Sequence, residues 1–135
     1  MKETKDIHFL VVDDMKTMRM IVKQVLKGHG AVTMTEADDG ATAWKYLDNP
    51  DGPHGKVDFI VSDWNMPLMT GLDLLKKCRT DNRYKDIAFL MVTAEQEGDQ
   101  VKNAIQSGVD GYVVKPFNPE SFGQRLSAVM KKRFS

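Results

Sequence analysis

Three acidic residues in this chain of 135 residues stand where short apolar runs end. Asp13 and Asp14 follow the run 7–12, and Asp63 follows the run 57–62. Runs this short and rich in β-branched residues are typical of buried strands rather than of helices. Three carboxylates at one edge of a sheet would repel one another, so we expect a cation among them. Only hard oxygen ligands are at hand, and these favour Mg²⁺ over zinc.

Two further polar residues follow apolar runs in the second half of the chain. Thr93 ends the run 87–92, and Lys115 ends the run 111–114. A hydroxyl and a positive point charge both suit a phosphoryl group. We therefore interpret Asp63 as a carboxylate that attacks phosphorus, while Mg²⁺ and Lys115 neutralise the charge of the transferred group.

Each of these residues also has a purely structural interpretation. The pair Asp13 and Asp14 could cap a helix, which is a common use of aspartate. Thr93 could cap the next helix, and Lys115 could be a solvated lysine at the rim of the sheet. Asp63 is harder to explain in this way, because an acid that ends a buried strand needs a partner. Four separate strands end in residues that suit metal or phosphate binding, and this coincidence favours a single phosphate-and-metal site.

Five strands and five helices must position these residues, and they alternate along the chain. The expected strands are 7–12, 31–36, 57–62, 87–92 and 111–115, and the expected helices are 17–27, 38–47, 71–79, 99–106 and 119–132. This alternation predicts an α/β fold, a parallel sheet with helices on both faces. The first, third and fourth strands are the most apolar and belong in the middle. That favours the order 2-1-3-4-5, with the site at the switch point between the first and third strands.

The helical spacing also predicts which side chains face the core. We expect one face of the first helix and one of the third to be buried, through Met18, Ile21, Val22, Val25 and Leu26 in the first and Leu72, Leu75 and Cys78 in the third.

The bulk composition favours one domain over residues 1–135, with no separate output domain. Nineteen basic residues balance nineteen acidic ones, so no net charge steers the chain to nucleic acid or to an anionic membrane. No apolar run approaches the roughly 20 residues that span a bilayer. A lone cysteine, Cys78, suits a reducing compartment. We expect a soluble, cytoplasmic monomer.

Several stretches spread over nearly the whole chain carry a family resemblance. They are Val12-Asp13-Asp14, Ser62-Asp63-Trp64-Asn65-Met66-Pro67 and Gly111-Tyr112-Val113-Val114-Lys115-Pro116-Phe117, together with 17–19, 21–22, 71–72 and 91–95. The chain thereby resembles the receiver domain of two-component response regulators, which has a flavodoxin-like (βα)5 fold. Within that family it is most similar to the single-domain chemotaxis regulators of the CheY type.

The resemblance implies a role for each residue at the strand ends. Asp63 would accept a phosphoryl group from a histidine kinase of the chemotaxis type. Asp14, Asp63 and the backbone carbonyl of Asn65 would hold Mg²⁺, and Asp13 would act through a water molecule. Lys115 would pair with the phosphoryl group.

Other residues would follow or tune the phosphorylation. Thr93 would move to donate a hydrogen bond to the phosphoryl group, and Tyr112 would turn inward into the space that Thr93 leaves. Asn65 and Glu95 match positions that set the rate of phosphate loss. The peptide bond before Pro116 is expected to be cis.

The resemblance also implies partners for an output surface that includes Ile105, Val109 and Arg125. In such regulators this surface binds the flagellar motor switch protein, and a phosphatase is a further expected partner. Several features depart from the chemotaxis pattern. Ile105 and Val109 are bulkier than the alanines that are usual on this surface, and the loop 51–55 is longer than usual. Lys16 lies beside the acid pair, and the stretch 96–98 lacks the alanine and lysines that are usual there.

Three other functions are compatible with parts of this pattern. A receiver without motor output could be a phosphate sink or a phosphorelay intermediate. The triplet Asp63-Trp64-Asn65 resembles the Asp-x-Asp of aspartate-nucleophile phosphatases, but Asn65 cannot supply the general acid and base of that reaction. A flavodoxin-like electron carrier would need an anion-binding first loop, and here that loop begins with two acids.

Overall fold

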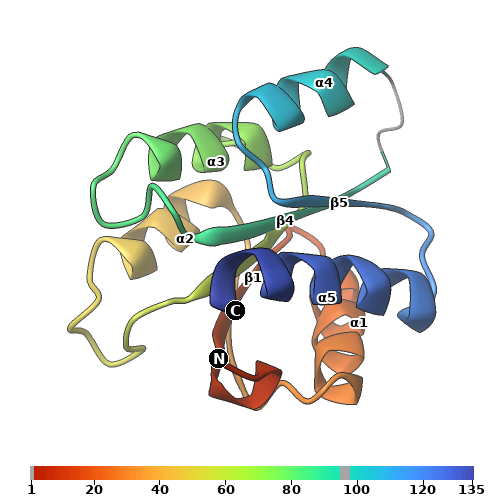
Figure 1. Cartoon of the computed structure of the whole chain (residues 1–135). Coiled ribbons are helices and arrows are strands. Elements are labelled where there is room, and N and C mark those ends of the chain that lie inside the picture. The colour runs from red at the N-terminus through yellow and green to blue at the C-terminus, as the bar shows by residue number, and fades with distance from the viewer. Residues whose placement is uncertain (1, 95–97) are drawn as a thin grey trace.

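A single parallel sheet runs through the middle of the molecule. The computed structural model describes residues 2–94 and 98–135, and Figure 1 shows its arrangement. The strands are β1 (His8–Val12), β2 (Thr33–Ala37), β3 (Phe59–Ser62), β4 (Ala88–Thr93) and β5 (Gly111–Val114). Their order is β2-β1-β3-β4-β5, which confirms the order predicted from the apolar content of the runs.

Helices cover both faces of this sheet. They are α1 (Lys16–Gly28), α2 (Gly40–Leu47), α3 (Gly71–Arg79), α4 (Gly98–Gln106) and α5 (Pro119–Phe134), preceded by the 3-10 turn η1 (Thr4–Asp6). Helix α3 has the predicted bounds, and a capping box between Thr70 and Asp73 fixes its start. The two chain ends lie close together (Figure 1), and the backbone N–H of Lys2 donates to the carbonyl of Phe134 at 3.2 Å.

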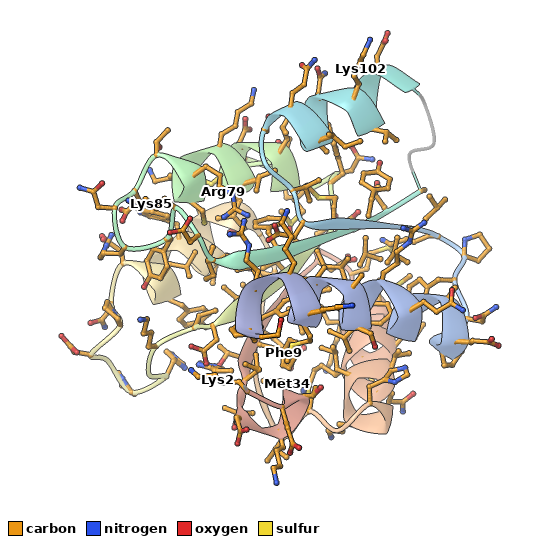
Figure 2. The ribbon with its side chains drawn as sticks, in the orientation of Figure 1. Lys2, Phe9, Met34, Arg79, Lys85 and Lys102 are labelled. Carbon is orange, nitrogen blue, oxygen red and sulfur yellow. The ribbon has the colours of Figure 1, made fainter. Side chains whose placement is uncertain are left out.

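The alternation of side chains along each strand divides the core into two layers. Odd positions of β1, such as Phe9 and Val11, pack with α1 and α5, and Phe9 is labelled in Figure 2. Even positions, such as Leu10 and Val12, pack with α2 and α3. Because the inner strands are buried on both faces, their sequences are continuously apolar.

One expected core position is wrong. Ile21 is 40% exposed, and only Val22 and Leu26 of α1 are fully buried. Helix α1 is an outer helix, so only a narrow stripe of it meets the sheet. In α3 the expected residues Leu75 and Cys78 are buried, and Leu72 is half-buried and packs against the core. Leu74, which was not expected there, is buried as well.

A cluster of charged residues, which we call the Asp110 cluster, lies before the start of β5. The Asp110 carboxylate is wholly buried and makes ion pairs with Arg79 of α3 at 3.2 Å, with Lys132 at 2.9 Å and with Arg133 at 2.8 Å. It also accepts a hydrogen bond from the backbone N–H of Phe89 at 3.0 Å. Arg79, labelled in Figure 2, donates to the carbonyl of Gly108 as well. These contacts join α3, α5, β4 and the start of β5 at the amino-terminal edge of the sheet.

Within the described residues, no helix has the length and apolar character that crossing a membrane requires. Cys78 is fully buried in the layer beneath α3, and burial raises the pKa of its thiol to about 12.

Candidate functional site

Three carboxylates converge at the carboxyl-terminal edge of the sheet. Asp13 and Asp14 follow β1, and Asp63 follows β3. One carboxylate oxygen from each lies within 4.8 Å of the other two. Asp13 and Asp63 are buried, whereas Asp14 is exposed. The strand register explains the convergence, because Val12 at the end of β1 is the partner of Ser62 at the end of β3.

One cation reaches this group from the end of β5. The Nζ atom of Lys115 lies 3.2 Å from Oδ2 of Asp13 and 3.5 Å from Oδ1 of Asp63. The backbone N–H of Lys115 donates to the carbonyl of Thr93 at 2.8 Å. The Lys115–Pro116 bond is cis, as predicted. We call Asp13, Asp14, Asp63 and Lys115 the acid site.

The charges of the acid site fit a divalent cation. Among the described residues, Lys115 is the one side-chain cation in ion-pair contact with these three carboxylates, so their mutual repulsion is only partly compensated. All the available donors are hard oxygen atoms, which is the ligand type that Mg²⁺ takes. The geometry therefore suits Mg²⁺ together with an oxygen-rich ligand such as a phosphoryl group.

The carboxylate of Asp63 sits in a confined environment. Its side chain is 9% exposed, and its Oδ1 atom accepts a hydrogen bond from the backbone N–H of Trp64 at 2.8 Å. Burial raises the pKa of Asp63 above its usual range. Lys115 opposes this rise in pKa, and the neighbouring Asp13 adds to it. Ionisation of this carboxylate therefore costs free energy, and a bound cation would lower that cost.

The loop after Asp63 folds back tightly toward the strand. The backbone N–H of Gly71 donates to the carbonyl of Trp64 at 2.8 Å. A Cβ atom at Gly71 would overlap the carbonyl oxygen of Asp63, so this position requires glycine. At the tip of the loop the N–H of Met69 donates to the carbonyl of Pro67 at 2.7 Å, and Leu68 adopts a φ of 68°.

Thr93 and Tyr112 lie on the two neighbouring strands β4 and β5. Thr93 is the last residue of β4 and is fully buried. Tyr112 is half-buried, lies opposite Met91 in the ladder and packs against the layer beneath α3. Asn65 lies two residues beyond Asp63, and its side chain is exposed. The movements of Thr93 and Tyr112, and the role of the Asn65 carbonyl, stay predictions.

The residues expected on the output surface differ in exposure. Ile105 of α4 and Arg125 of α5 are exposed. Val109 is half-buried and packs against the core. Glu95 and the stretch 96–97 lie outside the described residues, so their expected roles also stay predictions.

The capping interpretation of the acid pair does not hold. The N-cap residue of α1 is Met15, with no hydrogen bond from its side chain. The Oδ1 atom of Asp13 accepts from the backbone N–H of Met15 at 2.9 Å, and its Oδ2 atom faces Lys115. Lys16 makes no ion pair with Asp13 or Asp14, all three being among the described residues; it lines a hollow of about 300 Å³ with Arg19 and Glu36.

One residue that supports the acid site, Arg19, was not predicted from the sequence. Arg19 donates from Nη1 to the backbone carbonyl of Asp13 at 2.8 Å and from Nε to Glu36 at 3.0 Å. Hydrogen bonds from Lys23 and Arg19 lower the pKa of Glu36. The sequence signal for Arg19 was its place: it is a basic residue about one turn into the helix that follows the acid pair.

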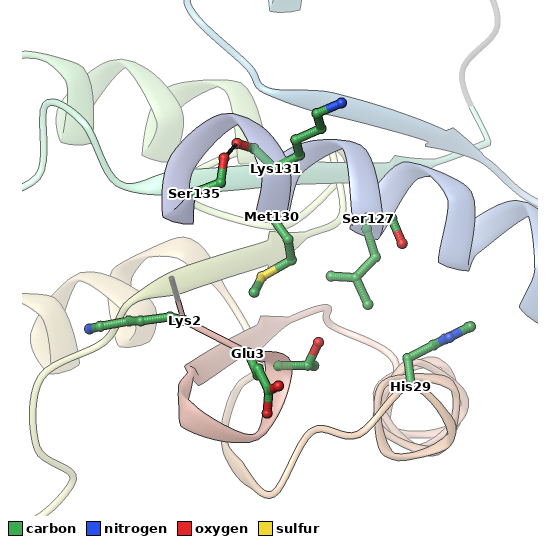
Figure 3. A pocket seen from close by; sticks show the side chains of 9 residues that line it. Lys2, Glu3, His29, Ser127, Met130, Lys131 and Ser135 are labelled. Carbon is green, nitrogen blue, oxygen red and sulfur yellow. Dashed lines mark hydrogen bonds between the residues drawn. The ribbon is translucent and has the colours of Figure 1, made fainter.

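A larger hollow lies elsewhere, between the N-terminal segment, the end of α1 and α5. Its volume is about 670 Å³, and none of the acid-site residues lines it. Figure 3 shows Met130 of α5 pointing toward the segment that carries Glu3. The volume of a hollow therefore does not indicate where the candidate reactive residues of this protein lie.

Comparison with known proteins gives a consistent result. The family model described as the response regulator receiver domain matches residues 9–127. The chain is 46% identical over 123 residues to the chemotaxis protein CheY of Pseudomonas aeruginosa, covering 91% of this chain and 95% of the relative. It is 44% identical over 128 residues to the chemotaxis protein CheY-3 of Vibrio cholerae, covering 95% of each.

Solved structures agree with these sequence matches. The chemotaxis response regulator CheY4 of Vibrio cholerae superposes with a TM-score of 0.79 at 33% identity, covering 91% of this chain and 98% of that one. A response regulator receiver domain protein of Clostridium thermocellum gives a TM-score of 0.80 at 19% identity, with 93% and 95% covered, and shows likeness in fold alone.

Proposed function

Because this chain belongs to the response regulator receiver family, we propose that it is phosphorylated on Asp63 in a Mg²⁺-dependent reaction. A histidine kinase of the chemotaxis type supplies the phosphoryl group. The chain then relays the signal to a downstream protein, for which the flagellar motor switch is our first candidate. Its role is that of a phosphoacceptor in signalling rather than of an enzyme that turns over a substrate.

The observation that carries this proposal is the ammonium group of Lys115 beside the clustered carboxylates of Asp13, Asp14 and Asp63. Lys115 lies within 3.5 Å of both Asp13 and Asp63, so its ammonium group can contact a phosphoryl group that is attached to Asp63. Asp14, Asp63 and the Asn65 carbonyl would hold Mg²⁺ directly and Asp13 through water. When bound, Mg²⁺ neutralises charge on the phosphoryl oxygens.

The transfer step needs no further protein chemistry. An Asp63 oxygen forms a bond to phosphorus while the bond from phosphorus to the imidazole nitrogen of the donor breaks. The electron pair stays on the imidazole, which then takes up a proton from water. Catalysis is then mainly positioning and charge neutralisation, which the residues of the acid site support.

The response after phosphorylation would involve Thr93 and Tyr112. Their positions at the end of β4 and in the middle of β5 suit a local charge change that biases a nearby two-state element. Curated relatives at 46% and 44% identity are chemotaxis proteins, which supports a chemotaxis output and a partner phosphatase. Enhanced binding of a flagellar switch peptide in the presence of beryllofluoride would separate motor output from a phosphate sink or relay.

Acetyl phosphate tests the central step. We expect the protein incubated with acetyl phosphate and Mg²⁺ to gain the mass of one phosphoryl group, and EDTA to prevent the gain. Asp63→Asn should abolish labelling, because an amide oxygen is a far weaker nucleophile than a carboxylate. Asp38→Asn is the matched control, since Asp38 is an exposed acid just after β2, and it should label normally. Undiminished labelling of Asp63→Asn would contradict the proposal.

A further inference from the structure

The peptide bond that joins Asp13 to Asp14 lies just beyond the end of β1. The backbone N–H of Asp13 still donates to β2, at the carbonyl of Ala37, over 3.1 Å. Strand β1 itself ends at Val12, so the carbonyl of Asp13 lies beyond the strand pairing. It accepts instead from a side chain, the Nη1 atom of Arg19, at 2.8 Å. The peptide between the two acids is therefore held by a guanidinium group rather than by a neighbouring strand.

Asp14 depends on this peptide for its direction more than the other acid of the pair does. The carboxylate of Asp13 is fixed by its own contacts, with the backbone N–H of Met15 at 2.9 Å and with Nζ of Lys115 at 3.2 Å. Asp14 is exposed, and no hydrogen bond or ion pair with another described residue holds its carboxylate. One of its oxygen atoms nevertheless lies within 4.8 Å of those of Asp13 and Asp63. The backbone therefore directs the Asp14 carboxylate to the acid site.

The guanidinium group of Arg19 is itself held in place. Its side chain is 14% exposed, and its Nε atom donates to Oε1 of Glu36 at 3.0 Å. The other carboxylate oxygen of Glu36 accepts from Nζ of Lys23, one turn further along α1, at 3.1 Å. Because a guanidinium group is planar and rigid, the contact of Nε with β2 also fixes the direction in which Nη1 points. Helix α1 and strand β2 together thus determine where the Asp13 carbonyl is held.

We propose that Arg19 is a positioning residue for Mg²⁺, which holds the Asp13–Asp14 peptide so that the Asp14 carboxylate faces the acid site. This inference rests on the proposed function. The charge of Arg19 has the opposite effect on the metal, because a guanidinium group near the acid site repels a divalent cation. If charge alone mattered, removal of Arg19 would strengthen Mg²⁺ binding. If positioning matters more, its removal weakens binding, as the loss of a group behind a metal ligand usually does. The sign of the change therefore separates the two effects.

A titration of the unphosphorylated protein with Mg²⁺ gives the test. Arg19→Met removes the charge and both donors, and we expect the Kd for Mg²⁺ to rise about tenfold. Titration calorimetry measures the Kd, and the rise in melting temperature with Mg²⁺ concentration gives a second measurement. Lys23→Met is the matched control, because Lys23 lies on the same helix, carries the same charge and pairs with Glu36 rather than with Asp13. Its Kd should equal that of the parent or be lower.

A second variant keeps the charge and removes the planar group. In Arg19→Lys a single ammonium nitrogen replaces the fork that contacts both Glu36 and the Asp13 carbonyl, so the Kd should rise by a smaller factor than in Arg19→Met. If Arg19→Met does not melt cooperatively in EDTA, Arg19→Lys decides the matter, and a Kd equal to that of the parent would overturn the inference. A Kd for Arg19→Met at or below that of the parent would also overturn it, as would an equal rise in Lys23→Met. Absence of Mg²⁺ binding in the parent would instead overturn the proposed function.

Discussion

Two clusters of buried charge lie at opposite edges of the same sheet, and they are built in opposite ways. In the acid site, three carboxylates face one ammonium group. In the Asp110 cluster, one wholly buried carboxylate faces two guanidinium groups and an ammonium group. The acid site is short of positive charge and the Asp110 cluster is not. Burial of an aspartate alone therefore does not indicate a cation site, whereas an excess of carboxylates does.

The pKa directions express the same difference. Burial acts to raise the pKa of both Asp63 and Asp110. For Asp63 it prevails over Lys115, and the pKa is raised. For Asp110 the hydrogen bonds from Arg133 and Lys132 outweigh burial, and the pKa is lowered. The first carboxylate gains from a new cation, and the second already has its partners.

The largest expected effect on stability comes from breaking the Asp110 cluster. Asp110→Asn leaves Arg79, Lys132 and Arg133 without their shared anion, and the free energy of unfolding should fall by about 3 kcal/mol at neutral pH. Urea denaturation measures this. Lys132→Gln is the control: its side chain is 55% exposed, so the change should be about 0.5 kcal/mol or less.

The pH dependence of that loss follows from the lowered pKa. The stability that the Asp110 carboxylate provides is fully present above its ordinary pKa of 3.8. It is lost as the pH falls below 3.8 through the lowered folded-state pKa. The difference in free energy of unfolding between the parent and Asp110→Asn should therefore become smaller in that pH range. A difference that does not change with pH would show that the carboxylate charge does not hold the cluster together.

A smaller effect should come from adding Mg²⁺ to the acid site. At a hundredfold excess over its Kd, Mg²⁺ should stabilise the parent by about 2.7 kcal/mol. It should also change the emission of Trp64, which follows Asp63 directly and donates its backbone N–H to the Asp63 carboxylate. Lys132→Gln should respond as the parent does, and Asp14→Ala should lose both responses. An unchanged melting temperature and spectrum in the parent would count against the metal assignment.

The smallest expected effect is a gain in stability, whereas Asp110→Asn is expected to lose stability. In Mg²⁺-free buffer at neutral pH, Asp63→Asn removes a charge whose pKa is raised by burial. We expect a gain of about 1 kcal/mol, or about 4 °C in melting temperature. Differential scanning calorimetry in EDTA measures it. A loss of stability would mean that the acid site is balanced without a cation.

The acid site was predictable from the sequence because the ends of the strands have a recognisable pattern. Apolar runs such as 9–12 are followed directly by a charged residue, and a parallel sheet brings all its carboxyl ends to one edge. Asp13, Asp63, Thr93 and Lys115 could therefore be grouped without coordinates. The order of the strands followed from the apolar content of the runs in the same way.

The other charged cluster could not be predicted in this way. Asp110 stands before a strand rather than after one, and its partners come from α3 and from the end of α5. No short spacing connects them. The conformation of Leu68 was equally hidden, because neither glycine nor asparagine occupies that position. Ile21 matched the helical period but lies beside the narrow stripe of α1 that meets the sheet.

Gly71 shows that a residue can be indispensable without reacting. A methyl group there would displace the main chain of Asp63, so even alanine would move the phosphoacceptor away from Lys115. In a saturation mutagenesis screen for signalling, position 71 should tolerate as few replacements as position 63. Intolerance at a single position would therefore not separate the nucleophile from the turn that gives it room.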